Sequence, residues 1–180
     1  MNDEEIMLQV SNGELAQATF LFERFNLIIY NYFVRNTMNK MISQDLTQNV
    51  FHRIIKYRKS YREDYQFKPW IFSIARNVLM DHIKEEKKHR GEEIQEELTG
   101  NFFEESYLDQ TERIEKEKTL QKALLKLKDD ERDVLILSKY QQMKYNEIAQ
   151  IMNVTESAIK VKVHRAIKKL RETYFQLEKV

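Results

Sequence analysis

The sequence predicts an all-α protein of two small helical domains, which are joined by a flexible acidic linker. Three observations lead to this fold class. Only three of the 180 residues are Gly and one is Pro, while 42% are hydrophobic and 33% are charged. This balance is typical of helical proteins and unlike that of sandwiches or barrels. Apolar residues also recur at helical spacing, and the charges divide the chain into three blocks.

The charge pattern predicts the domain boundaries. Residues 1–90 contain 14 Lys and Arg against 11 Asp and Glu, and residues 119–180 contain 13 against 8. The block between them, residues 91–118, contains 3 against 10. Two basic blocks around an acidic one indicate two domains that meet a polyanion and a linker that does not, although a solvated charged surface explains the composition about as well. We expect domains at residues 1–90 and 116–180 and a linker at 91–115.

Four helices are expected before the linker. A short one runs from Glu4 to Val10, and three apolar stripes indicate longer ones. The stripes are Leu15, Phe22, Phe25, Ile29 and Phe33; Leu46, Val50, Ile54 and Tyr57; and Ile71, Ile74, Ala75, Val78 and Ile83. Pro69 stands where the last helix could begin, because the first turn of a helix does not need the N–H that Pro lacks.

After the linker, the pattern predicts a helix-turn-helix within a second helical group. The expected helices are Ile114–Leu127, Glu131–Tyr140, Tyr145–Met152 and Thr155 to about Leu177. Ala149 supplies the small residue that the helix contact needs. Asn153 tolerates the left-handed backbone of the turn, and Thr155 can cap the following helix by accepting from the N–H of Ser157 or Ala158.

The outer face of this last helix has the character of a DNA-reading surface. It carries Ser157, Lys160, Val161, His164, Arg165 and Lys168, opposite an apolar stripe that begins at Ile159. Six basic residues and one acidic residue lie between Val154 and Arg171. A helix placed only for solubility more often mixes the signs, so the major groove of DNA is a better explanation than a plain helical hairpin.

Two further surfaces are predicted in the N-terminal block. The segment SQDLTQNVFHRIIKY places Asp45, Gln48, Asn49 and His52 on one helical face, which suits docking on a protein helix or plain solvent exposure. The segment YRKSYREDYQFKPW mixes five aromatic residues with four cations. Aromatic faces stack on unpaired bases while cations follow the backbone, although some of these rings, Trp70 above all, are expected in the core. The next helix presents Ser73, Arg76, Asn77, Met80, Lys84, Lys87 and Lys88 away from its apolar stripe, and its basic end also suits the helix dipole.

Other function classes find little support in the sequence. The absence of Cys excludes disulfides, thiolate zinc sites and thiol catalysis, and it fits a cytoplasmic protein. The acidic N-terminus is unlike a signal peptide, and no apolar run approaches the ~18 residues of a membrane span. The four His, at positions 52, 82, 89 and 164, are not spaced with carboxylates as metal ligands, and no Gly-rich phosphate loop is present. We therefore expect neither an enzyme nor a cofactor.

Three segments, in this order, resemble the extracytoplasmic-function (ECF) group of bacterial sigma factors, the subunits that give RNA polymerase its promoter specificity. DLTQNVF is similar to the polymerase-docking segment of sigma region 2, and FKPWIFSIARNVLMDHIKEEKK to its promoter-melting and −10-reading segment. YNEIAQIMNVTESAIKVKVHRAIKKL is similar to region 4, which reads the −35 element. The chain departs from the family pattern at Gln142 and Asn153, where Gly is common, and it lacks a Pro in LKLKDDERDV.

The resemblance implies a non-enzymatic subunit that binds core RNA polymerase, at the β′ clamp helices and the β flap, and promoter DNA. It assigns polymerase binding to Asp45, Leu46, Gln48, Asn49, Phe51 and His52; −10 recognition and melting to Lys59, Tyr61, Arg62, Tyr65, Phe67, Trp70, Arg76, Asn77, Lys84, Lys87 and Lys88; and −35 recognition to Thr155, Ser157, Lys160, Val161, His164, Arg165 and Lys168. It leaves open whether an anti-sigma factor binds the chain. A conventional regulator of duplex DNA would explain the C-terminal block but leave the other two surfaces without a role.

Overall fold

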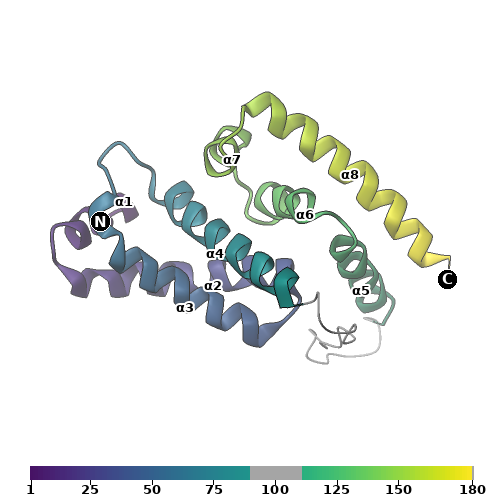
Figure 1. The fold of residues 1–180 in the computed structure, drawn as a ribbon, viewed down its shortest axis with the longest axis horizontal. Coiled ribbons are helices and arrows are strands. Elements are labelled where there is room, and N and C mark those ends of the chain that lie inside the picture. Colours follow the sequence, from purple (N-terminus) through teal and green to yellow (C-terminus); the bar gives the residue numbers. More distant parts are fainter. Residues whose placement is uncertain (90–110, 180) are drawn as a thin grey trace.

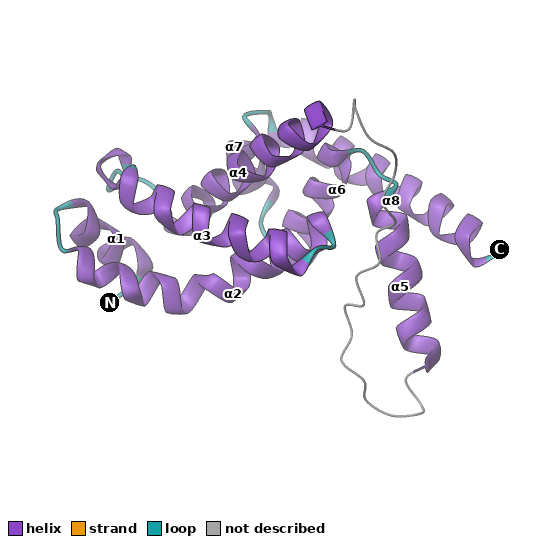
Figure 2. Cartoon of the chain, turned by 60° about the horizontal axis from the view of Figure 1, so that its bottom comes forward, coloured by secondary structure: helices purple, strands orange, loops and turns teal. Residues whose placement is uncertain are grey.

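The computed structural model describes residues 1–89 and 111–179, and in these two ranges every regular element is a helix (Figure 1, Figure 2). Residues 90–110, which include most of the linker expected at 91–115, lie outside the described residues. None of the helices in the described ranges is long and apolar enough to cross a membrane. The described helices form two groups, one on each side of the linker.

The N-terminal domain contains the four expected helices. They are α1 (Asp3–Ser11), α2 (Ala18–Thr37), α3 (Lys40–Lys56) and α4 (Phe67–His89), with short 3₁₀ turns at Leu15–Gln17 and Arg58–Ser60. Helix α1 begins with a reciprocal cap, because Asn2 Oδ1 accepts from the N–H of Glu5 and the Glu5 carboxylate accepts from the N–H of Asn2. Helix α4 begins two residues before Pro69, which lies in its first turn, where its missing N–H costs nothing.

The buried stripe of α2 differs from the expected one at its beginning. Leu15 and Phe22 are both 46% exposed, whereas Leu21 and Tyr32 are buried. The reason is that Leu15 belongs to the 3₁₀ turn before α2, so the helical repeat that faces the core starts at Leu21. Tyr57, expected in the α3 stripe, ends that helix as its C-terminal cap and is also half exposed.

The C-terminal domain consists of α5 (Thr111–Leu125), α6 (Asp129–Leu135), α7 (Tyr145–Met152) and α8 (Glu156–Glu178). Helix α5 begins inside the range expected for the linker. The helix expected over Glu131–Tyr140 is present as two parts, because α6 continues into a π-helical turn, Ile136–Tyr140. This wider turn directs both Ile136 and Leu137 into the protein interior.

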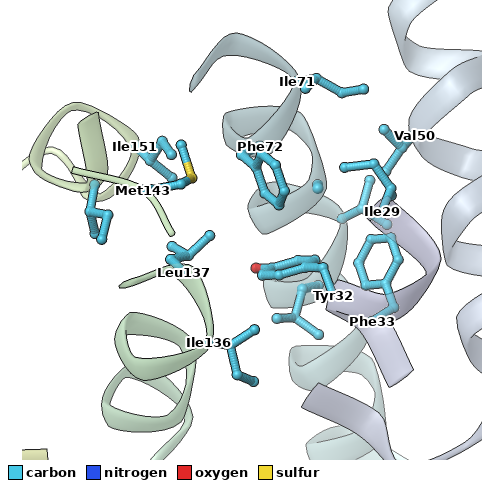
Figure 3. Packing of buried hydrophobic residues seen from close by; sticks show 14 of the residues in the cluster. Ile29, Tyr32, Phe33, Val50, Ile71, Phe72, Ile136, Leu137, Met143 and Ile151 are labelled. Carbon is cyan, nitrogen blue, oxygen red and sulfur yellow. The ribbon is translucent and has the colours of Figure 1, made fainter. Parts of the chain in front are cut away.

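One hydrophobic core extends across both domains (Figure 3). Tyr32 and Phe72 lie at its centre and pack edge to face, with ring centroids 5.5 Å apart. On one side they meet apolar residues of the N-terminal domain, among them Phe33. On the other side they face Leu137 and Met143 from the C-terminal domain. We call this contact region between the domains the junction.

The helix-turn-helix is formed as the sequence predicts. Asn153 ends α7 in the left-handed conformation, with φ 53° and ψ 49°, and the N–H of Val154 donates to the carbonyl of Ala149. Thr155 then caps α8, since its hydroxyl accepts from the N–H of Ala158 at 3.1 Å. Ala149 is buried, which lets the two helices approach each other.

Replacing Thr155 by Ala should lower the free energy of unfolding by about 1 kcal/mol, because the N–H of Ala158 would lose its acceptor at the start of α8. Urea unfolding followed by circular dichroism measures this change. Thr155→Ser keeps the hydroxyl and should stay within a few tenths of a kcal/mol of the parent. Equal losses in both variants would show that the cap does not stabilise the helix-turn-helix.

Candidate nucleic-acid and polymerase interface

The outer face of α8 is open along the segment predicted to read DNA. Ile159, Val163 and Ala166 are buried against the rest of the C-terminal domain. The predicted residues all lie on the exposed side: Thr155, Ser157, Lys160, Val161, His164, Arg165 and Lys168. Lys160 forms an ion pair with Glu156, one turn earlier, at 3.3 Å. The structure therefore brings this set together on one face of one helix.

The polar face of α3 is also exposed, with one exception among the predicted residues. Asp45, Gln48, Asn49 and His52 point to solvent. Leu46 is only 8% exposed and packs in the core, so its expected place on the docking surface is wrong. An exposed polar row with a buried Leu is what the helical period of α3 requires, because Leu46 shares a face with Val50.

An apolar hollow of about 240 Å³ lies beside this polar row, between α2 and α3. Phe51 is half buried at its edge, where it meets Phe22 edge to face with ring centroids 4.9 Å apart. The lining also includes Ala18, Thr19, Leu21, Ile54 and Ile55. The hollow was not predicted, because the apolar stripe that includes Phe22 indicated a core position for this residue, which is 46% exposed. An exposed apolar patch next to polar residues is typical of a protein-binding surface.

The aromatic residues before α4 are packed more tightly than the sequence predicts. Tyr61 is 5% exposed and Phe67 is fully buried. The Tyr61 ring packs edge to face on Trp70 at 5.0 Å, and its hydroxyl donates to the carbonyl of Tyr65 at 2.7 Å. Burial raises the pKa of Tyr61 to about 12. The prediction that Tyr61 and Phe67 offer open rings to unpaired bases is therefore wrong, since both rings belong to the core.

Among the aromatic residues assigned to the −10 element, Tyr65 and part of Trp70 are open to solvent. Tyr65 is 39% exposed, and the Arg62 guanidinium lies 5.4 Å from its ring centre. Arg62 also forms an ion pair with Asp64 at 3.1 Å. Lys59 is exposed in the short turn that precedes this group. A ring and a guanidinium at the surface keep the chemistry needed for stacking on an unpaired base.

Helix α4 presents its predicted polar residues in two different settings. Asn77, Lys84 and Lys88 are exposed. Arg76 and Lys87 instead reach the C-terminal domain. The Lys87 ammonium lies 2.8 Å from the Asp129 carboxylate, and the Arg76 guanidinium contacts two carboxylates of α6. Only Arg76 is largely covered by these contacts, with 17% of its side chain exposed, whereas Lys87 stays exposed beside Asp129.

A buried polar cluster at the junction was not predicted. Asp133 is fully buried, and it accepts from the Tyr32 hydroxyl at 2.7 Å and from Arg76 Nε at 3.1 Å. Burial raises the pKa of Asp133 to about 6, against the opposing effects of Tyr32 and Arg76. Burial likewise raises the pKa of Tyr32 well above its usual value, with a further contribution from Asp133. In the sequence these residues belong to three separate segments, so no local pattern connects them.

The fold is similar to that of two solved complexes. The structure of CnrH in complex with the cytosolic domain of CnrY matches with a TM-score of 0.71 at 19% identity, over 94% of this chain and 95% of that one. The sigma factor RpoE in complex with the anti-sigma factor NepR, from Bartonella quintana, matches with a TM-score of 0.70 at 20% identity, over 86% and 94%. These likenesses support the helical architecture.

Sequence comparison identifies the family. The profile of "Sigma-70 region 2" matches residues 21–89, and that of "Sigma-70, region 4" matches residues 117–170. The RNA polymerase sigma factor YlaC of Bacillus subtilis (strain 168) is 31% identical over 84% of this chain and 88% of its own length. The ECF RNA polymerase sigma factor SigM of the same organism is 27% identical over 86% and 93%. The two sigma domains, each matched over the helices that carry its surfaces, show that this chain belongs to the ECF family of RNA polymerase sigma factors.

Proposed function

We propose that this sigma factor uses three separate surfaces to direct RNA polymerase to promoters. The outer face of α8 reads the −35 element in the major groove. The open side of α4 and the turn before it hold the −10 element and the melted strand. The polar face of α3 docks on the polymerase. The observation that carries the proposal is the exposed basic face of α8, set at the second helix of a helix-turn-helix.

Family membership supports a role without catalysis, since sigma factors are initiation factors. Run-off transcription with purified core RNA polymerase, followed by mapping of the transcript starts, tests the role in initiation. The chain should produce starts that core polymerase alone does not produce. Transcripts that are the same with and without the chain would contradict the role.

For −35 recognition, Arg165 is the residue best suited to read a base. It is exposed on α8, and a guanidinium can bond both acceptors of a guanine edge. Arg165→Ala should weaken promoter binding by about 1–3 kcal/mol and relax the preference at one −35 position. Binding of holoenzyme to a mapped promoter and to its single-base variants measures both effects.

Arg171→Ala is the matched control, because Arg171 is exposed near the middle of the same helix and lies outside the predicted reading set. It should weaken all promoter variants alike, as expected of a residue that contacts only phosphate. If Arg165→Ala also weakens every variant equally, Arg165 contributes charge and does not read a base.

For polymerase docking, the polar row of α3 and the hollow beside it form one continuous surface. Asp45 and Gln48 are exposed, and Phe51 connects their helix to the apolar lining. Polar groups around an apolar centre are the usual anatomy of a protein interface. We therefore assign docking to Asp45, Gln48, Asn49, Phe51 and His52, and we give Leu46 a structural role beneath them.

Replacing Asp45 and Gln48 together by Ala should raise the Kd for core polymerase by about tenfold or more, while the helical circular dichroism stays unchanged because both side chains are exposed. Competition with labelled parent protein for core polymerase measures the affinity. Replacing Glu63 and Gln66 by Ala provides the control, because they are an exposed acid and an exposed amide outside α3. Equal affinity of the docking variant and the parent would show that the face is only solvated.

For −10 recognition, the structure changes the set of residues that we propose to contact DNA. Tyr65, Trp70, Asn77, Lys84, Lys87 and Lys88 retain exposed surface, so they are the proposed contacts in the arrangement described here. Lys59 and Arg62 extend this surface at the turn. The buried rings of Tyr61 and Phe67 support Trp70 from below. This assignment keeps stacking and backbone contact on one side of the N-terminal domain.

An anti-sigma factor is a proposed additional partner. The support is the similarity to RpoE, which was solved in complex with the anti-sigma factor NepR. Binding of such a partner by this chain would need surface that is apolar and exposed in the free protein, and the hollow between α2 and α3 offers such surface.

A further inference from the structure

Helix α1 has no part in the three surfaces proposed above, yet it packs against the segment that leads into α4. Its inner face is buried in the N-terminal core. The helix contacts α2, α4 and the 3₁₀ turn Arg58–Ser60. We call residues 58–66, which connect α3 to α4, the −10 turn, because they include Arg62 and Tyr65 from the set assigned to the −10 element. The −10 turn thus packs on a helix that has no assigned role.

The N-terminus of α4 takes its cap from α1 and not from its own segment. Helices most often begin after Ser, Thr, Asp or Asn, whereas Gln66 precedes α4. The half-buried carboxylate of Glu4 reaches across instead, and its Oε1 accepts from the N–H of Phe67 at 3.0 Å, over 63 positions of sequence. A negative acceptor is favourable there, because the first N–H groups of a helix lack partners within it and the helix dipole is positive at that end.

This contact adjoins the groups that are assigned to an unpaired base. Phe67 comes one turn before Trp70, and their ring centroids lie 6.1 Å apart. The Tyr61 ring lies 5.0 Å from that of Trp70, and its hydroxyl donates to the carbonyl of Tyr65. Glu4 also lies near Tyr61, because its negative charge adds to burial in raising the pKa of that tyrosine. The positions of Tyr65 and Trp70 therefore depend on where α4 begins.

Helix α1 is itself held on both sides of Glu4. Asp3 forms an ion pair with Arg24 of α2 at 2.6 Å, and Glu5 takes part in the reciprocal cap with Asn2. An exposed ion pair contributes little to stability. Together with the cap, however, it fixes the first turn of α1, and this leaves the Glu4 carboxylate few orientations.

We propose that Glu4 is a positioning residue for −10 recognition. By accepting from the first N–H of α4, it fixes the −10 turn, so that Tyr65 and Trp70 are already in place when a base becomes unpaired. A ring that is held in place loses less conformational freedom on stacking than a mobile one. The proposal rests on the assignment of the −10 element to this side of the N-terminal domain, and it adds a residue from outside that surface.

The test compares four variants of the full chain. Glu4→Ala removes the acceptor, and Glu4→Gln restores an uncharged one. Asn39→Ala is the control for stability, because Asn39 caps α3 by accepting from the N–H of Ile42 at 3.0 Å. It lies at the other end of α3 from the −10 turn, about 25 Å away along a helix of 17 residues. Glu14→Ala, at an exposed position, controls for the lost negative charge.

Trp70 is the only Trp of the chain, so its fluorescence reports on the −10 turn in the free protein. Glu4→Ala should shift the emission to longer wavelength and make Trp70 more accessible to quenching by acrylamide, because the start of α4 is no longer fixed. The other three variants should resemble the parent. Parent-like emission and quenching in Glu4→Ala would overturn the proposal.

Promoter opening by holoenzyme measures the consequence for recognition. Permanganate reactivity is compared between a mapped promoter and single-base variants of its −10 element. Glu4→Ala should reduce the discrimination between these promoters by about tenfold, which is within the range that one stacked base supplies. Glu4→Gln should restore most of the discrimination, and the two controls should retain it. Unchanged discrimination in Glu4→Ala, no restoration by Glu4→Gln, or an equal loss in Asn39→Ala would each contradict the role of Glu4.

The same measurement separates this proposal from the function on which it rests. If the parent opens the mapped promoter and its −10 variants to the same extent, the −10 assignment fails, and the proposal fails with it. If the parent discriminates between them and Glu4→Ala discriminates equally well, only the role of Glu4 is wrong, and the −10 assignment stands.

Discussion

Replacing Phe72 by Ala should lower the free energy of unfolding by about 3–5 kcal/mol. The Phe72 ring is fully buried and lies between Tyr32 on one side and the apolar residues of the C-terminal domain on the other (Figure 3). Truncation removes contacts on both sides, and the neighbours belong to separate helices, so the space cannot close by a single small shift. Urea unfolding, followed by circular dichroism and Trp70 fluorescence, measures the loss.

Phe20→Ala is the matched control for this prediction. Phe20 is 50% exposed on α2, so its truncation removes little buried area and should change the unfolding free energy by less than about 1 kcal/mol. A similar loss in the two variants would mean that Phe72 does not hold the junction. A loss in the Phe72 variant alone locates the stabilisation at the centre of the shared core.

The protein should become more stable as the pH falls from about 7.5 towards about 5, because of the carboxyl group of Asp133. Its pKa is about 6 in the folded chain, against an ordinary value of 3.8. Between these two values the folded chain holds a proton that the unfolded chain has lost, so unfolding becomes harder as the pH falls through 6. A difference of this size corresponds to on the order of 1–3 kcal/mol.

The ionisable neighbours of Asp133 determine how the pH dependence of stability is interpreted. It faces Tyr32 from α2, Arg76 from α4 and Asp130 from its own helix. Asp129 and Glu131 act in the opposite direction, because salt bridges and hydrogen bonds outweigh their partial burial and hold their pKa values below the ordinary range. Their stabilisation is lost only as the pH falls through those lowered values. The range from 7.5 to 5 therefore lies above the titration of Asp129 and Glu131.

Asp133→Asn provides the control, since it removes the titrating group but keeps an acceptor for Tyr32 or Arg76. Urea unfolding at several pH values should show a gain on acidification in the parent and a much smaller one in the variant. The comparison uses slopes, so a lower overall stability of the variant does not affect it. Parallel pH profiles for the two proteins would show that another group titrates.

Local features of the sequence were sufficient to predict the helix-turn-helix. Asn153 and Thr155 act through their own backbone and the next turn of helix, so their neighbours in the sequence contain the information. The outer face of α8 followed from helical spacing for the same reason. The start of the buried stripe on α2 did not follow from helical spacing, because the 3₁₀ turn at Leu15–Gln17 shifts the helical register before α2 begins.

The environment of the predicted site residues depended on contacts that no local pattern contains. Arg76 and Asp133 are 57 positions apart, and Tyr32 and Asp133 are 101 apart. A basic residue on a helix gives no sign of whether DNA or a distant carboxylate will meet it. Tyr61 was equally ambiguous, because an aromatic residue next to cations suits both a stacking surface and a core. Only the packing of Trp70 against it decides between these two roles.

The continuous core at the junction determines how the two domains can move. Tyr32, Phe72, Leu137 and Met143 are packed there as in the interior of a single domain. Close-packed side chains lose much of their attraction after a displacement of less than 1 Å, so partial separation has no favourable intermediate position. Packed interfaces therefore switch between discrete states and do not deform gradually. On this basis the two domains are either packed together or fully separated. Any partner that separates them must supply the whole free energy of separation in one step.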